Sequence, residues 1–229
     1  MKPTYTAGTT SFNSQSVAEF QKTDRTTITR LAKRGAYDKD TVYAILDDAL
    51  VCTVAFVLEG QPFQIPTGFC RIGDLLYIHG SVGSFYMREL AEKKLPVSIG
   101  VTHIDGLVLA RSAFHHSVNY RSVVIFSNAE QVTDNTELYT ALEVFTNKMQ
   151  PGRWDDIRQP NDSEWKKTMV LKFKIEEASA KIRTGGPNDD EEDYHLNIWA
   201  GVVPLTLERK PLISDPRLKS GVNVPDYLL

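Results

Sequence analysis

A short segment of this chain has the composition of an anion-binding turn. Residues 75–78 are four consecutive apolar or aromatic positions, typical of a buried strand, and Gly80 and Gly83 then let a ligand approach the backbone closely. Ser84 can cap the helix that the spacing predicts over residues 84–95. Free N–H groups at a helix start, beside serine hydroxyls, suit a phosphate. Such a turn is more often an ordinary strand-turn-helix, so other residues must decide.

Two later positions carry side chains that recognise ligands in many proteins. Arg121 opens a predicted strand beside Ser122, and a guanidinium makes bidentate contacts with phosphate or carboxylate. Taken alone, Arg121 is more simply explained as the ion-pair partner of a surface acid. Trp199, close to Gly201, suits either a core aromatic or a flat wall against a planar ring. None of these residues decides the function alone.

The histidines lack the spacing of a protein-bound metal site. A transition metal needs at least three converging ligands, and neither His-x-x-x-His nor His-Glu-x-x-His occurs. His115 and His116 would point to opposite faces of an extended segment, so at most one could join a shared site. The hydrolase, Walker A and Rossmann glycine motifs are absent as well. We therefore predict that the chain has no metal ligands. We also predict that its ligand is a phosphate ester other than a nucleoside triphosphate or a Rossmann-bound dinucleotide.

Composition narrows the class of partner and the compartment. Lys and Arg total 26 against 29 Asp and Glu, and this net charge of −3 offers no field for nucleic acid or an anionic membrane. No run approaches eighteen apolar residues, and residues 1–6 lack the apolar segment of a secretion signal. We expect a cytoplasmic protein with no nucleic-acid or membrane partner. Cys52 and Cys70 sit in apolar strands and are predicted to be buried thiols.

The polar positions are expected on an antiparallel sheet with peripheral helices. Apolar spacing predicts helices over residues 38–49 and 84–95, and an Asx-x-x-Glu capping box at 134–137 starts a third. Asp105-Gly106 is predicted to be a hairpin turn, and Pro62 and Pro66 indicate an edge strand or a bulge. Alternation and β-branched content predict strands over residues 50–58, 61–69, 75–78, 96–103, 107–114, 120–132 and 168–175. The fold class is therefore α+β and β-dominated, an antiparallel sheet or small barrel.

The chain divides into one folded domain with a tail at each end. Residues 1–22 are expected to be an N-terminal tail or arm, 23–205 the domain, and 206–229 an extended, proline-bearing C-terminal tail. Residues 189–193 are five consecutive acids. Consecutive carboxylates do not form a calcium loop, so this run is predicted to be a solvated surface loop.

Six segments in order make the chain similar to a known family. It resembles the pyridoxamine 5′-phosphate oxidase-related flavin-binding proteins, and within them the nitroimidazole-reductase-like branch. The segments that carry the resemblance are residues 60–67, 76–84, 101–110, 116–123, 180–185 and 199–205. What the resemblance implies is an antiparallel split β-barrel homodimer with one FMN in each of two clefts at the subunit interface.

The resemblance also implies a set of cofactor contacts. The strand over residues 63–67 would lie along the flavin ring and contribute Phe63, Ile65, Pro66 and Thr67. The ribityl chain and phosphate would lie on His79, Gly80, Ser81 and Ser84, with His79 the candidate catalytic residue because it is nearest the reactive face. Arg121 and Ser122 match the second wall, and Trp199 the aromatic that approaches from the partner subunit.

One departure from the family pattern concerns the phosphate. Relatives place Arg or Lys in the turn after the serine segment, whereas this chain has Phe85-Tyr86 there and first reaches a base at Arg88. We predict that the missing charge comes from Arg88 or from one of the bases Arg25, Arg30, Lys33 and Arg34.

The activity expected from this resemblance is that of an FMN-dependent oxidoreductase acting on an unidentified small planar acceptor. The cofactor would carry the redox chemistry, and His79 would donate a hydrogen bond or a proton, or else merely contact the ribityl chain. Two alternatives stay open. One is a flavin carrier or a redox or ligand sensor without turnover. The other is a haem-binding split barrel, in which His115, His116 or His195 would supply an axial ligand.

Overall fold

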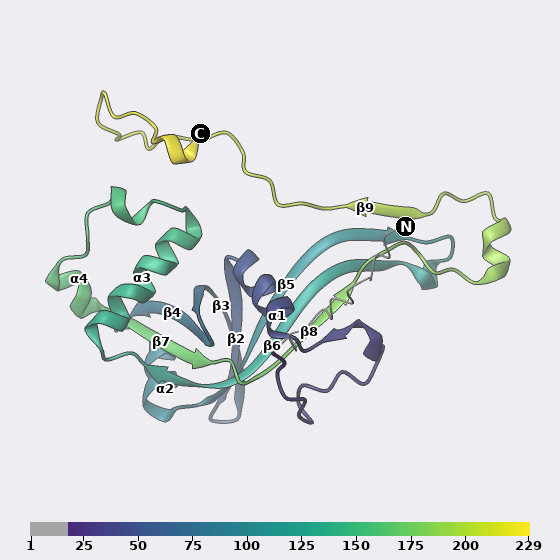
Figure 1. Cartoon of the computed structure of the whole chain (residues 1–229), viewed down its shortest axis with the longest axis horizontal. Coiled ribbons are helices and arrows are strands. Elements are labelled where there is room, and N and C mark those ends of the chain that lie inside the picture. The colour runs from purple at the N-terminus through teal and green to yellow at the C-terminus, as the bar shows by residue number, and fades with distance from the viewer. Residues whose placement is uncertain (1–17) are drawn as a thin grey trace, which may run out of the picture.

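A single antiparallel sheet organises the described part of the chain, residues 18–229 of a computed structural model (Figure 1). Six of its strands close into a barrel in the order β2-β3-β4-β7-β6-β5, with β5 pairing back onto β2. The strands are β1 (Gly35–Ala36), β2 (Val51–Leu58), β3 (Gln61–Ile72), β4 (Leu75–Ser81), β5 (Pro96–Leu109), β6 (Ser117–Gln131), β7 (Thr168–Lys174), β8 (Glu177–Arg183) and β9 (Gly201–Pro204). The β-dominated, antiparallel fold class is confirmed.

Strands β5 and β6 are longer than the barrel and form an arm that leaves it. They have 14 and 15 residues and pair continuously from Pro96 with Asn128 to Val108 with Ser117. At about 3.3 Å per residue, each spans roughly 45 Å. Outside the barrel, β8 and then β1 pair on the β6 side, and β9 pairs on the β5 side. The barrel with its helices lies at the left of Figure 1 and the arm extends to the right.

The predicted hairpin turn at Asp105-Gly106 is wrong. β5 continues through these residues with only a bulge between Ile104 and Gly106, and the chain reverses later, in residues 110–116. Pairing with β6 on one side and β9 on the other outweighs the local turn preference. The glycine serves close packing instead, since a Cβ at Gly106 would lie 3.1 Å from the Val203 carbonyl oxygen of β9.

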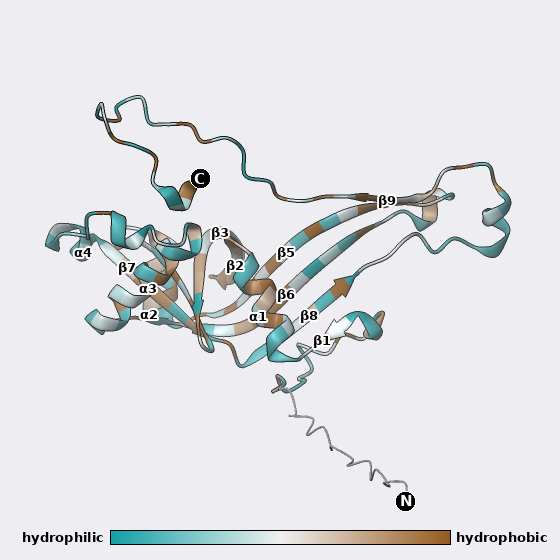
Figure 2. Cartoon of the chain, turned by 45° about the horizontal axis from the view of Figure 1, so that its top comes forward, coloured by the Kyte–Doolittle hydropathy of each residue, from teal (hydrophilic) through white to brown (hydrophobic). Residues whose placement is uncertain are grey.

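Helices close the barrel and cover one side of it. The helices are α1 (Lys39–Asp48), α2 (Phe85–Lys93), α3 (Asn135–Met149) and α4 (Asp162–Lys167). The first and third begin within a residue of the predicted starts, because Asp38 accepts from the Thr41 N–H and Asp134 from the Glu137 N–H, both at 2.8 Å. α1 and α2 bury apolar side chains in the main core, whereas α3 packs on a second cluster outside the barrel. Brown and teal alternate along the strands in Figure 2, as expected for a sheet with an apolar interior.

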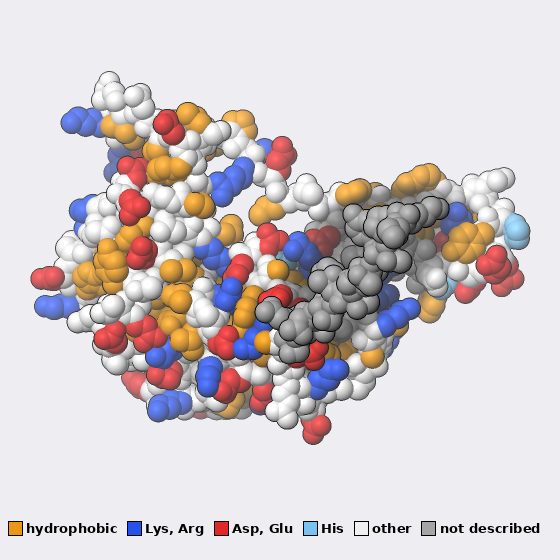
Figure 3. Space-filling model, in the orientation of Figure 1, with side chains coloured by type: hydrophobic (Ala, Val, Ile, Leu, Met, Phe, Trp, Pro, Cys, Tyr) orange, Lys and Arg blue, Asp and Glu red, His pale blue; other side chains and the backbone are white. Residues whose placement is uncertain are grey.

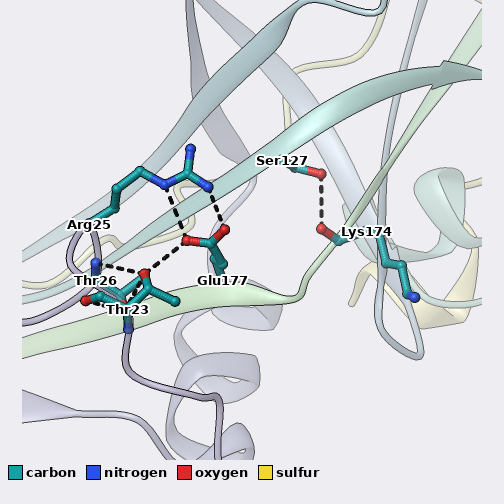
Figure 4. Close-up of polar contacts among 6 residues, drawn as sticks. All are labelled: Thr23, Arg25, Thr26, Ser127, Lys174 and Glu177. Carbon is teal, nitrogen blue, oxygen red and sulfur yellow. Dashed lines mark hydrogen bonds and ion pairs between the residues drawn. The ribbon is translucent and has the colours of Figure 1, made fainter.

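The N-terminal segment is attached to the sheet edge by polar contacts. Thr23 Oγ1 donates to Glu177 at 2.9 Å, and the Arg25 guanidinium forms an ion pair with the same carboxylate (Figure 4). Phe20 is buried and meets Tyr43 of α1 edge-on, with ring centroids 5.9 Å apart. The part of the predicted N-terminal tail that is described, residues 18–22, is therefore packed against the domain, and the rest lies outside the described residues.

The C-terminal segment returns from the arm to the barrel. After β9 it runs without regular structure to η5 (Asp226–Leu228), which lies beside α3 (Figure 1). Tyr227 fixes this end, because its hydroxyl donates to Asp156 at 2.6 Å and its carbonyl accepts from Gln150 at 2.8 Å. Between the two ends, Leu207 is 95% exposed and Ile213 97% exposed. We call residues 205–225 the strap.

Replacement of Gly68 by alanine tests the packing of α3 on the barrel. A Cβ at Gly68 would lie 2.9 Å from the Phe145 ring, so the ring must move, and we expect a loss of about 1–3 kcal/mol in the free energy of unfolding. Gly100→Ala is the matched control, since nothing lies within 4 Å of its Cβ. Urea unfolding of both variants measures the difference. Equal stabilities would mean that α3 does not pack on β3 as described.

Candidate functional site

The two strand segments predicted to contact a cofactor border the place where β3 and β4 separate. Residues 61–68 of β3 pair only with β2, and residues 69–72 pair with β4. Beyond the pair Phe69–Ile78, β4 continues on β7 alone. Residues 63–67 therefore have one free backbone edge, which accounts for Pro62 and Pro66 in this strand. His79, Gly80 and Ser81 lie on the facing strand directly past the separation.

Helix α3 covers this separation with one aromatic side chain. The Phe145 ring contacts Gly68 of β3 and meets the His79 ring edge-on, with centroids 4.5 Å apart. No water-sized void remains in the space that Cys70, His79 and Phe145 line. Burial lowers the pKa of His79, because the imidazolium form would lose its hydration there. The neutral form is favoured at neutral pH.

The turn after β4 leads into α2 with its polar groups facing outward. Ser84 is the N-cap residue as predicted, but its hydroxyl makes no capping hydrogen bond. Ser81 Oγ accepts from the Gly83 N–H at 3.1 Å. Arg88 lies one helical turn later and is exposed, and no ion pair joins it to another residue within 18–229. The uncapped Ser84 hydroxyl and the first N–H groups of α2 are donors of the kind that suit a phosphate, and Arg88 lies on the next turn of the same helix.

Among the rival bases of the N-terminal cluster, Arg25 already has an ion-pair partner. Figure 4 shows the Arg25 guanidinium directed at Glu177, and this partner together with Thr23 holds the pKa of the Glu177 carboxyl below its usual range. Lys33 and Arg34 belong to η1 (Ala32–Arg34), next to the edge strand β1. Of the predicted bases, Arg88 is the one adjacent to Ser84.

Arg121 is held by two carboxylates. Its Nε and Nη2 donate to Asp105 at 3.0 Å each, and Nη1 donates to Asp48 at 3.0 Å. These partners raise the pKa of the guanidinium above its ordinary value, with the Asp105 hydrogen bond the largest cause. The geometry matches the ion-pair alternative for Arg121, and its contact with a cofactor stays a prediction. Ser122 Oγ donates to the Lys181 carbonyl at 3.2 Å across the ladder to β8.

Trp199 lies at the far end of the arm, away from the β3–β4 separation. It is 68% exposed, so the core-aromatic alternative is wrong. Its indole ring lies against Gly201, since a Cβ built on this glycine would be 3.0 Å from the ring. This chain's own Trp199 therefore does not reach the β3–β4 separation, which we call the barrel site. In the predicted homodimer, the Trp199 of a second copy would approach it instead.

The outer part of the arm holds a buried polar network that the sequence did not predict. Arg183 is 7% exposed, donates to Asn119 and to the carbonyls of Gly185 and Gly186, and has no carboxylate partner among the described residues. Burial lowers its pKa. The one sequence signal for it is the Thr-Gly-Gly that follows Arg183, whose carbonyls this side chain binds.

The acidic run is not wholly solvated, which corrects the prediction for residues 189–193. The Asp189 side chain is buried and accepts from the N–H and Nη1 of Arg111, both at 3.0 Å. Hydrogen bonding and the charge of Arg111 hold the pKa of this carboxyl below its usual value despite burial. The network fixes loop 184–200 to loop 110–116, and we call these two loops together the arm end.

The closed six-stranded barrel with a protruding two-stranded arm is a split barrel, the architecture of the pyridoxamine 5′-phosphate oxidase-like proteins. A family model described as pyridoxamine 5′-phosphate oxidase matches residues 38–182, which is more than half of the chain. The chain belongs to this family.

Solved structures identify more similar relatives. The flavocytochrome Anf3 from Azotobacter vinelandii is 38% identical over 90% of this chain and 95% of its own, with a TM-score of 0.84. An FAD- and haem-binding protein from Mycobacterium smegmatis is 36% identical over 85% of this chain and 95% of its own, with a TM-score of 0.81. A candidate 5-nitroimidazole resistance protein from Bacteroides thetaiotaomicron, at 22% identity, 65% and 86% coverage and a TM-score of 0.55, shares the fold.

Two negative findings complete the comparison. No curated protein matches this chain significantly. Across residues 18–229, none of the helices combines the length and apolar character needed to cross a membrane.

The lowered pKa of His79 predicts a pH dependence of stability. At neutral pH both folded and unfolded chains carry a neutral imidazole; as pH falls below about 6.5, the unfolded chain binds the proton first. His79 therefore lowers the free energy of unfolding progressively on acidification. We expect His79→Gln to lose less stability than the parent between pH 7.5 and 5, measured by urea unfolding. Equal losses would contradict the depressed pKa.

Proposed function

We propose that this chain binds a flavin at the separation of β3 and β4. The observation that carries the proposal is that both predicted contact segments, residues 63–67 and 79–84, border this one place, in a chain 38% identical to a flavocytochrome. The free edge of β3 would receive the ring, and Ser81, Ser84 and Arg88 the ribityl phosphate end. Bound there, a flavin supplies hydride and electron transfer. FMN is the form expected from the sequence, whereas the Mycobacterium smegmatis relative supports FAD.

We further propose that the flavin protein is a homodimer. The outer faces of β2, β5 and β6 form one continuous surface, because Gly100 of β5 pairs with Thr53 of β2 on one side and with Val124 of β6 on the other. These faces expose large apolar side chains that none of the helices within residues 18–229 covers, namely Val51, Val57, Ile104 and Val124. The strap adds Leu207 and Ile213, and Figure 3 shows the molecule hollowed between the barrel and the arm, below the strap. Apolar area of this kind favours a protein interface, and a second copy would bring its Trp199 to the barrel site.

The activity proposed is that of an oxidoreductase on a small planar acceptor, with a flavin carrier or sensor as its alternative. Phe145 currently fills the space next to His79, so a ring that contacts this imidazole must displace the aromatic side chain. A neutral His79 can donate one hydrogen bond there, and it can serve as a proton source only once protonated. Stopped-flow reduction by NADH or NADPH followed by reoxidation with a nitroaromatic or quinone separates turnover from mere binding.

A second cofactor, haem, is favoured by the two most similar structures described above. Their names include haem or a cytochrome, and they are 38% and 36% identical to this chain over 85% or more of its length. The haem-binding split barrel, the second of the two alternatives from the sequence, is thus compatible with flavin binding rather than opposed to it. We propose that the protein binds both.

Arg88→Ala tests the phosphate assignment. The purified protein is expected to show an oxidised-flavin spectrum, and chromatography of the released flavin distinguishes FMN from FAD. Loss of one charge-assisted contact should weaken flavin binding by roughly tenfold or more, measured by fluorescence quenching. Arg30→Ala is the matched control and should leave affinity unchanged. A colourless protein that quenches no added flavin overturns flavin binding, whereas an effect of Arg30→Ala alone overturns only the role of Arg88.

The paired substitution Leu207→Asp and Ile213→Asp tests the dimer. Both side chains are almost fully exposed in the single chain, so the change should not destabilise the fold, but two buried charges would oppose association. We expect a dimer for the parent and a monomer for the variant by analytical ultracentrifugation at micromolar concentration. Lys219→Asp in the same strap controls for charge. A monomeric parent would refute the homodimer.

A further inference from the structure

Lys148 is a partly buried lysine to which the proposed flavin site gives no role. It lies on α3, one turn after Phe145, and its Nζ donates to the Leu46 carbonyl near the end of α1 at 2.9 Å. Nζ also lies 3.7 Å from the centroid of the Phe69 ring. Within residues 18–229, no carboxylate forms an ion pair with it. An ammonium group at this place therefore loses hydration without gaining a direct counter-charge.

The titratable groups around Lys148 do not supply the missing counter-charge. Asp47 of α1 forms an ion pair with Arg71 of β3, whose Nε donates to it at 2.9 Å. Cys52 and Cys70 are buried, and burial raises the pKa of both thiols to about 12, so they stay neutral. Burial lowers the pKa of Lys148, because Asp47 offsets only part of the lost hydration.

A neutral Lys148 amine can keep both of its contacts. It has two N–H groups, one for the Leu46 carbonyl and one for the face of the Phe69 ring. Neither contact uses the nitrogen lone pair, which makes a desolvated lysine a nucleophile. A cation at this position would also suit the C-terminal end of α1, and this structural role is the alternative to a chemical one.

A surface cavity of about 350 Å³ opens beside Lys148, between α1, β3 and α3. Its lining consists of Asp47, Arg71, Glu143, Val144, Asn147 and Lys148. Glu143 has no ion-pair partner among the described residues. Asn147 Oδ1 accepts from the Trp154 N–H at 3.2 Å, which leaves the Nδ2–H groups available to a ligand. Two carboxylates and one guanidinium make this lining net negative when the amine is neutral, so it suits an uncharged ligand better than an anion.

We infer that this cavity binds a small uncharged aldehyde and that Lys148 forms an imine with it. The Nζ lone pair attacks the carbonyl carbon, and one proton moves from Nζ to the carbonyl oxygen to give a carbinolamine. Asn147 can donate a hydrogen bond to this oxygen, and the Glu143 carboxylate can carry the protons. The C–O bond then breaks and water leaves. Its oxygen comes from the aldehyde and both of its hydrogens from Nζ, so no oxidant or reductant is needed.

Reductive trapping on the full chain tests this inference. Benzaldehyde is the probe because it is uncharged and compact, and sodium cyanoborohydride converts an imine into a stable secondary amine that peptide mass spectrometry locates. At pH 7, we expect Lys148 to be labelled about tenfold or more faster than the exposed Lys167 and Lys219. Its labelling should saturate with benzaldehyde concentration, and benzyl alcohol, which has no carbonyl, should compete. Equal labelling of the three lysines, or labelling of Lys148 that neither saturates nor is competed, overturns the inference.

Two substitutions separate the amine from its surroundings. Lys148→Arg keeps the charge and a donor for the Leu46 carbonyl, so far-ultraviolet circular dichroism should show an unchanged fold while saturable labelling disappears. Glu143→Gln should slow labelling of Lys148 several-fold and leave Lys167 unaffected, whereas Glu92→Gln, on the exposed side of α2, is the matched control and should change nothing. Saturable labelling that persists in Lys148→Arg overturns the assignment to Lys148. Unchanged labelling in Glu143→Gln overturns only the role of Glu143. The flavin spectrum of the same sample reports on the proposed function separately.

Discussion

The continuous ladder between β5 and β6 is the constraint on which the rest of the structure depends. Both strands take part in closing the barrel, and both continue well past it. Because antiparallel strands must satisfy their backbone groups along their full length, the emerging pair recruits β8 on one side and β9 on the other. The arm, its end and the return of the strap all follow from this excess length.

A second consequence is the unequal covering of the sheet. The barrel interior and the α3 side are packed with apolar side chains, whereas the outer faces of β2, β5 and β6 carry small residues and exposed valines and isoleucine. The separation of β3 from β4 lies between the covered and uncovered regions, and Phe145 occupies it from the α3 side. A ligand placed there meets a free strand edge, a helix N-terminus and a histidine whose pKa is lowered by burial. The barrel site and the arm end also differ in kind, since the first offers donors for an anion and the second carries the exposed aromatic side chains Phe114 and Trp199.

Most secondary structure was predictable from local signals. The helices at 39–48 and 135–149 begin at acids that accept the expected backbone N–H groups, and the prolines of β3 correctly indicated a strand with an open edge. The turn at Asp105-Gly106 was not predictable, because two neighbouring strands hold this dipeptide extended. For the candidate site, the sequence named the segments that meet at the β3–β4 separation, but not Phe145 between them. The sequence also left the partners of Arg121 open and did not predict the burial of Asp189. These ion pairs join residues 16 to 78 positions apart, and contacts over such separations produce no pattern in the local sequence.

By itself, the sequence determined the composition of the core, the caps of the long helices, the β-dominated class and the order of the family's segments. These properties depend on side-chain type and on spacings of a few residues, and both can be read directly from the sequence. Only the tertiary structure decided which histidine is buried and which is free, that Arg121 is neutralised by two carboxylates, and that Trp199 lies exposed at the end of an arm. The physical reason is that burial, tautomer and charge pairing are set by neighbours brought together across the sheet, and those neighbours are chosen by strand pairing rather than by proximity in sequence.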